Sequence, residues 1–223
     1  MATAYNPGIV TSGLVLCLDA GNAKSYPGSG SSWTDLSGNG NTCTLYNTPT
    51  YSSSNGGYLS LNGTNQYGTV GSTSAILGSS TFSFTVACYK TSSPATRGIL
   101  FSKASNYIDL GFSSQIMVSK CDVTTGTQRL FYGNAATQNT WKVHTVTYDG
   151  LNVVIYENGA VASTTASTTG LYVPGGSLYI GNYDGGGSYY FAGYLSVVHC
   201  YNVTLTADQV LQNYNALRGR FGL

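Results

Sequence analysis

Residues 141–162 constrain the fold most, because they contain two strands and two turns in one continuous run. From Trp141 to Tyr148 the side chains alternate in character, as those on the two faces of a sheet do. Asp149-Gly150 predicts a two-residue hairpin turn, and Asn158-Gly159 predicts a second turn after another apolar strand. The run therefore predicts a β-meander, with Trp141 buried at its start.

Short strands separated by turn residues recur along most of the chain. They are predicted at residues 14–18, 58–61, 66–70, 81–90, 98–103, 107–112, 116–120, 129–132 and 177–181. Within residues 81–90, Phe82, Phe84 and Val86 share one face, while small and polar residues occupy the other. Strands spaced in this way predict an all-β fold, a sandwich of two antiparallel sheets.

Two segments depart from the strand pattern. Residues 20–56 are rich in Gly, Ser, Asn and Thr and predict a long loop, held to the core by Trp33, Leu36 and Leu45. Residues 205–217 predict a helix, with Thr206 as its N-cap. We therefore expect an N-terminal arm over residues 1–12, one domain over 13–217 and a C-terminal tail over 218–223.

The chain carries very little charge. Charged residues make up 8% of the sequence and the formal net charge is +1, whereas soluble domains usually have about 25% charged residues. Nucleic-acid binding depends on clustered Lys and Arg, so the composition argues against a nucleic-acid partner. The 19 tyrosines and 29 glycines favour a rigid, turn-rich surface that contacts sugars or another protein through tyrosine rings.

The cysteines do not form a recognisable framework. They are odd in number and lack the spacing of a metal site: Cys17, Cys43, Cys88, Cys121 and Cys200. Most lie in apolar strands, which favours free buried thiols over disulfides. The first residues lack the features of a secretory signal, and no apolar run is long enough to span a membrane, so we expect no membrane partner.

Four segments, in order, resemble the concanavalin A-like, laminin-G-like jelly-roll domains. They are residues 13–41, which include Asp35-Leu-Ser-Gly-Asn-Gly-Asn41, residues 58–67, the meander from Trp141, and residues 178–205 with Leu178-Tyr-Ile-Gly181. The resemblance implies a two-sheet antiparallel jelly-roll sandwich, here with a short C-terminal helix. Such domains serve mostly in binding.

The sequence departs from this family pattern near its end, where Ser196 and Val197 replace an acidic pair and His199 replaces an arginine. Related domains bind calcium through carboxylates, and Asp184 is the nearest candidate here. Calcium takes six to eight oxygen ligands. No cluster of carboxylates accompanies Asp184, so a turn role is favoured over calcium binding, and no cofactor is predicted.

The sequence contains no recognisable set of catalytic residues. Glycoside hydrolases use two carboxylates that flank the scissile bond. Glu157 is the only glutamate and has no acidic neighbour along its strand. His144 and His199 lack an adjacent acid or a serine elbow. We therefore predict a protein that is not an enzyme and has no catalytic residues, and we disfavour a hydrolase.

Residues 18–30 and 213–222 resemble the variant of this domain found in structural proteins of tailed bacteriophages. This resemblance implies a virion protein made in the host cytoplasm. The first hypothesis is a non-enzymatic capsid decoration or cement subunit, with the major capsid protein or further copies of itself as partners. Its docking residues would lie in the arm and the tail: Tyr5, Ile9, Arg218, Arg220 and Phe221.

The alternative hypothesis is a carbohydrate-binding receptor-recognition module of a phage tail or fibre. Residues 183–190 form a tyrosine-rich loop, and sugars stack on exposed aromatic rings. The candidate contacts to a host-surface glycan or another partner are Tyr183, Asp184, Tyr189 and Tyr190. The number of copies per particle would separate the two hypotheses, because decoration requires many copies on the head.

Overall fold

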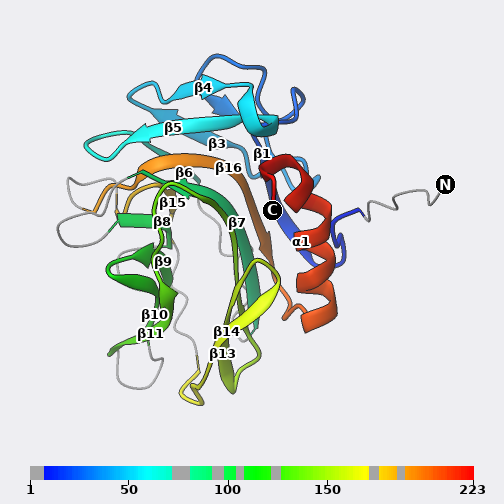
Figure 1. Ribbon diagram of the computed structural model, residues 1–223, viewed down its shortest axis with the longest axis vertical. Coiled ribbons are helices and arrows are strands. Elements are labelled where there is room, and N and C mark those ends of the chain that lie inside the picture. Colours follow the sequence, from blue (N-terminus) through cyan, green and yellow to red (C-terminus); the bar gives the residue numbers. More distant parts are fainter. Residues whose placement is uncertain are drawn as a thin grey trace.

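The computed structural model describes residues 8–71, 81–91, 98–103, 108–121, 127–170, 176–184 and 189–223. In these residues two antiparallel sheets pack face to face and one helix, α1 (Ala207–Phe221), lies on the outside (Figure 1). The predicted all-β antiparallel sandwich with a C-terminal helix is confirmed.

The two sheets each have eight strands among the described residues. Sheet A has the order β14 (Ala160–Ala166), β13 (Asn152–Glu157), β12 (Trp141–Tyr148), β7 (Phe82–Lys90), β16 (Ala192–Tyr201), β5 (Tyr58–Asn62), β4 (Thr50–Ser52). Its eighth strand, β1 (Leu14–Asp19), lies off this order and pairs with β16. Sheet B has the order β11 (Gln128–Ala135), β10 (Gln115–Cys121), β9 (Ile108–Phe112), β8 (Gly98–Lys103), β15 (Leu178–Ile180), β6 (Tyr67–Val70), β3 (Cys43–Tyr46), β2 (Ser32–Trp33).

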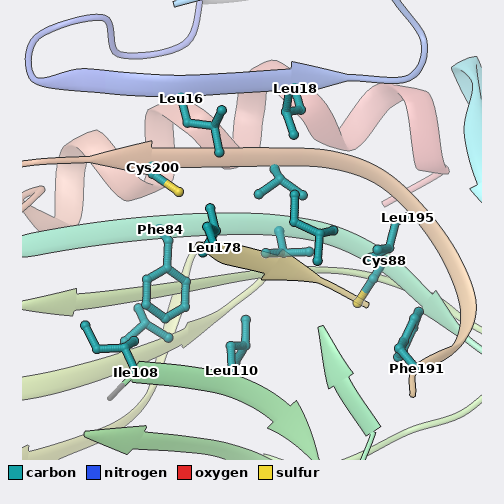
Figure 2. Packing of buried hydrophobic residues seen from close by; sticks show 14 of the residues in the cluster. Leu16, Leu18, Phe84, Cys88, Ile108, Leu110, Leu178, Phe191, Leu195 and Cys200 are labelled. Carbon is teal, nitrogen blue, oxygen red and sulfur yellow. The ribbon is translucent and has the colours of Figure 1, made fainter. Parts of the chain in front are cut away.

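The main core lies between the two sheets. Phe82, Phe84 and Val86 of β7 all point into it, which confirms the alternation predicted for that strand. Figure 2 shows Phe84 together with Ile108 and Leu110 from the opposite sheet. Burial of such side chains, each worth about 1.5–3 kcal/mol, is what holds the sheets together.

A second apolar cluster joins the outer face of sheet A to α1. Trp141 and Val143 of β12 pack with Leu217 and Phe221 of the helix. Thr206 caps the helix, since its side chain accepts a hydrogen bond from the backbone N–H of Gln209, as predicted. Sheet A is therefore buried on both faces at β12.

The helix is longer than predicted. It continues through residues 218–221, and Gly222 closes it in the left-handed conformation at φ 69°. Phe221 follows Leu217 by four residues and so lies on the same buried side of the helix. The expectation of a separate tail over residues 218–223 is therefore wrong for its first four residues.

The long loop expected at residues 20–56 is also partly ordered into strands. It contains β2, β3, β4 and a short 3₁₀ helix, η1 (Ser54–Gly56). Trp33 and Leu45 are buried anchors as predicted, while Leu36 is only half-buried. The segment supplies the strands at one edge of each sheet, because β3 pairs with β6 and β4 pairs with β5.

Of the two turns predicted in the meander, one is confirmed. Asn158 and Gly159 have φ of 51° and 77° between the paired residues Glu157 and Ala160, so this is a two-residue turn. The other prediction is wrong, since β12 ends at Tyr148 and β13 begins at Asn152, which leaves three residues, 149–151, in the turn.

The prediction of free thiols is confirmed for the cysteines whose side chains are described. Cys17, Cys43, Cys88 and Cys200 are all buried and are not in disulfide bonds. Burial raises the pKa of the Cys17 thiol to about 12, with Asp19 and Asp35 adding to the effect. The side chain of Cys121 lies outside the described part. Within that part, no helix is both long and apolar enough to cross a membrane.

Candidate functional site

The tyrosine-rich segment 183–190 is described at its two ends, and residues 185–188 lie outside the described part. Tyr183 and Tyr189 meet edge to face, with their ring centroids 5.7 Å apart. Tyr189 is exposed and has a φ of 61°, a conformation that a non-glycine residue adopts only where its surroundings hold it. Asn182 Oδ1 accepts a hydrogen bond of 2.8 Å from the backbone N–H of Asp184.

Tyr190 extends a row of rings on the outer face of sheet B. Tyr46 of β3 and Tyr67 of β6 pair directly across the two strands, and their rings stack with centroids 4.8 Å apart and planes 8° apart. The ring of Tyr190 lies 6.2 Å from that of Tyr67. Tyr46 is 41% exposed, so the end of this row is open to solvent.

A fourth tyrosine, Tyr179 of β15, lies beside the row. β15 pairs with β6, and Tyr179 lies opposite Thr69 on the outer face. Burial raises the pKa of Tyr67, and the neighbouring phenols of Tyr46, Tyr190 and Tyr179 raise it further. The Tyr67 phenol therefore stays protonated at neutral pH and can donate a hydrogen bond. We call Tyr46, Tyr67, Tyr179 and Tyr190 the tyrosine platform.

The sequence prediction found only one member of the platform, Tyr190. Tyr46, Tyr67 and Tyr179 come from three strands that are distant in the chain and adjacent in sheet B (Figure 1). The signal that could have found them is the alternation within each strand. Cys43 and Leu45 point into the core, so Thr44 and Tyr46 must point outward.

The platform suits a flat ligand that has an apolar face and a polar edge. A tyrosine ring offers an apolar face and a hydroxyl that forms hydrogen bonds. Three of the four rings are carried on hydrogen-bonded strands, so little conformational freedom is lost when a ligand binds to them. A sugar ring has this character, because its C–H face is apolar and its edge is made of hydroxyl groups.

The residues considered for catalysis lie away from the platform. His144 of β12 and His199 of β16 are buried, and burial lowers the pKa of each to about 4. Among the described residues, the Nδ1 atoms of both have no hydrogen-bond partner. The Glu157 carboxylate accepts a hydrogen bond of 3.0 Å from Lys142 Nζ. Both imidazoles are therefore neutral at pH 7, and the Glu157 carboxylate is ion-paired with Lys142.

The described residues contain no group of three or more His, Cys, Asp or Glu side chains that could hold a metal ion. Asp184 lies at a turn made by Asn182, as expected for a turn residue. Calcium binding at Asp184 stays a prediction.

The predicted docking residues are mostly engaged within the domain. Arg220 forms two hydrogen bonds of 2.9 Å to the carboxylate of Asp19, and Phe221 stacks on Trp141 with centroids 4.6 Å apart. Both side chains therefore have partners within the domain, and their predicted docking role stays a prediction. Arg218 is exposed beside the ring of Tyr214.

The described part of the arm is attached to α1. The backbone N–H of Val10 donates to Asn213 Oδ1 at 2.8 Å, and the Gln212 side chain donates to Gly8 O at 2.8 Å. Ile9, between these two contacts, is half-buried. Tyr5 lies outside the described residues. A docking role of Ile9, Arg218 or Tyr5 stays a prediction.

Solved structures show the same fold at low sequence identity. Domain 4 of an extracellular GH43 arabinanase from Geobacillus stearothermophilus, in complex with arabinotriose, has a TM-score of 0.70 and 16% identity, over 90% of this chain and 98% of that one. The botulinum neurotoxin serotype G binding domain has a TM-score of 0.73 and 16% identity, over 90% and 50%. The serotype D ligand binding domain in complex with N-acetylneuraminic acid has a TM-score of 0.73 and 9% identity, over 92% and 51%.

The chain thus spans about half the length of the neurotoxin binding domains that it matches. No curated protein sequence matches it. A family model described as the concanavalin A-like lectin/glucanases superfamily matches residues 62–211, which is well over half of the chain. These residues run from the end of β5 into α1 and include most of both sheets. The chain belongs to the concanavalin A-like lectin/glucanases superfamily.

Proposed function

We propose that this protein is a carbohydrate-binding module and that its tyrosine platform contacts the glycan. The observation that carries the proposal is the stacked pair of Tyr46 and Tyr67, held on adjacent strands and open to solvent at Tyr46. The arabinanase domain and the neurotoxin serotype D domain, each in complex with a sugar, support it by fold.

Replacing Tyr46 with Ala should weaken glycan binding by about tenfold or more, because a ring that stacks on a sugar buries apolar area worth more than 1 kcal/mol. Isothermal titration calorimetry with a panel of neutral and sialylated oligosaccharides measures this loss. Tyr46 is a surface side chain, so we expect the fold and the melting temperature to be retained.

Tyr132→Ala is the matched control. Tyr132 is 45% exposed and also lies on sheet B, on β11 at its far edge. The Tyr132→Ala variant should have the same glycan affinity as the wild type. The proposal fails if no oligosaccharide binds the wild-type protein, or if the two variants lose affinity equally.

The proposed function is binding without catalysis. Glu157 lies on β13 of sheet A, paired with Lys142, whereas the platform lies on sheet B. Glu157→Gln should therefore leave glycan affinity unchanged, and neither protein should cleave the glycan that it binds. Reducing-end release from a bound polysaccharide, present in the wild type and lost in Glu157→Gln, would show a hydrolase instead.

The proposed role in a virion rests on the sequence motifs alone. A carbohydrate-binding module at a phage tail or fibre is compatible with the platform. Copy number per particle is the measurement that separates this role from capsid decoration.

A further inference from the structure

A cavity of about 390 Å³ lies at the open edge of the sandwich, between the end of β3 in sheet B and β4 in sheet A. Two short segments line it, residues 26–31 and 45–51. Tyr46 itself is not among the lining residues, but it directly precedes the lining residue Asn47, so one loop connects the platform to the cavity.

Two aromatic rings form the apolar part of the wall. The rings of Tyr26 and Tyr51 lie 5.5 Å apart at 50° to each other. Tyr26 is almost fully buried, and its hydroxyl donates a hydrogen bond of 2.9 Å to Gly30 O. A Cβ at Gly28 would lie 3.4 Å from Tyr51 Cε1, so the backbone packs closely on that ring. Both rings are therefore held in place before any ligand binds.

The opposite wall is a strained loop. Asn47 and Thr48 have φ of 58° and 50°, and such a conformation is costly for a β-branched residue like Thr48. Gln66 Nε2 donates to Asn47 O at 3.0 Å and to Thr48 O at 2.9 Å. Asn47 Nδ2 donates to Asn65 O at 2.6 Å. These bonds fix the loop in the strained shape that forms the cavity.

The chemistry of the lining selects a neutral ligand. The residues that line the cavity include no Asp, Glu, Lys, Arg or His. Ser29, Ser31 and Thr48 are also among the lining residues, and each carries a hydroxyl group. Apolar ring faces combined with uncharged hydroxyl donors and acceptors match one sugar residue, and a carboxylate would find no cation there.

We propose that this cavity binds the terminal residue of a neutral oligosaccharide, as a second subsite beside the tyrosine platform. The inference rests on the proposed carbohydrate binding, and it adds the place and the charge class of the sugar. The bound chain would run from the cavity past the loop of Asn47 and Thr48 to Tyr46.

The test is titration calorimetry with arabinotriose, maltotriose and 3′-sialyllactose on the wild type and two cavity variants. Tyr51→Ala removes one ring, and Ser29→Leu fills the cavity from an exposed position that leaves the fold intact. We expect both variants to weaken the binding of a neutral trisaccharide by about tenfold or more. Tyr132→Ala is again the control and should have no effect.

The outcomes separate the two proposals. If a neutral trisaccharide binds and Tyr46→Ala weakens it while Tyr51→Ala and Ser29→Leu do not, the subsite is overturned and the platform stands. A wild type that prefers 3′-sialyllactose overturns the neutral subsite as well. If the wild type binds no saccharide at all, both proposals fail. Should Tyr51→Ala unfold, Ser29→Leu alone decides the matter.

Discussion

Replacing Trp141 with Ala should lower the free energy of unfolding by about 3–5 kcal/mol, the range for removing a large buried aromatic side chain. Trp141 is only 6% exposed. Its ring stacks on Phe221 and meets the ring of Tyr89 edge to face at 5.7 Å. The substitution would leave a cavity between β12 and α1 and would remove a ring contact that holds the helix on sheet A.

Chemical denaturation of the wild type and of Trp141→Ala measures this loss. Tyr132→Ala, at an exposed position, should change stability by less than about 0.5 kcal/mol. The double variant with Phe221→Ala should be less destabilised than the sum of the two single variants, because the two rings contact each other. A denaturation midpoint for Trp141→Ala equal to that of the wild type would contradict the packing of α1.

The sequence predicts well those features that local chemistry decides. Asn158 and Gly159 both need positive φ in a two-residue turn, and these two residue types adopt it most easily. Thr206 and Gln209 cap each other within one helical turn. The alternation of Phe82, Phe84 and Val86 follows from the geometry of a single strand.

The turn after Tyr148 shows how a local side chain can override a pattern. Asp149 Oδ1 accepts hydrogen bonds from the backbone N–H groups of Leu151 and Asn152, at 2.8 and 2.6 Å. These bonds hold Leu151 in the turn, so that three residues, 149–151, connect the strands. The dipeptide Asp149-Gly150 alone does not distinguish the two outcomes.

Features that depend on distant partners escaped prediction. Phe221 looked like a free apolar group because its partner, Trp141, lies far away in the sequence. Within residues 20–56, β3 and β4 pair with β6 and β5, which come later in the chain. The Gly and Ser content of the whole segment is typical of a loop. The tyrosine platform likewise exists only once β3, β6 and β15 are adjacent.

Acid should destabilise the protein in a pH range set by its two histidines. Burial lowers the pKa of His144 from 6.5 to about 4, with Glu157 acting to raise it and Lys142 to lower it. Burial likewise lowers the pKa of His199 to about 4, with Asp19 acting to raise it and Arg220 to lower it. Below pH 6.5 the unfolded chain therefore binds protons that the folded protein does not.

Because of this difference, the free energy of unfolding falls as the pH falls. The contribution of each neutral histidine is complete above pH 6.5 and is lost as the pH falls through about 4. One pKa unit corresponds to about 1.4 kcal/mol, so the loss is about 3 kcal/mol for each histidine. The pKa of Asp149 is lowered from 3.8 by hydrogen bonds that outweigh its desolvation, so its contribution is lost only below this range.

Urea denaturation at intervals from pH 7.5 to 4 should thus show a steep fall in the free energy of unfolding. His144→Gln and His199→Gln should each be less stable at neutral pH but should remove about half of the pH dependence, because glutamine does not titrate. The double variant should be nearly independent of pH in this range. If the free energy of unfolding of the wild type is constant down to pH 4, this prediction is wrong. Both imidazoles would then bind protons in the folded protein as readily as in the unfolded chain, in contact with water or with an acidic partner.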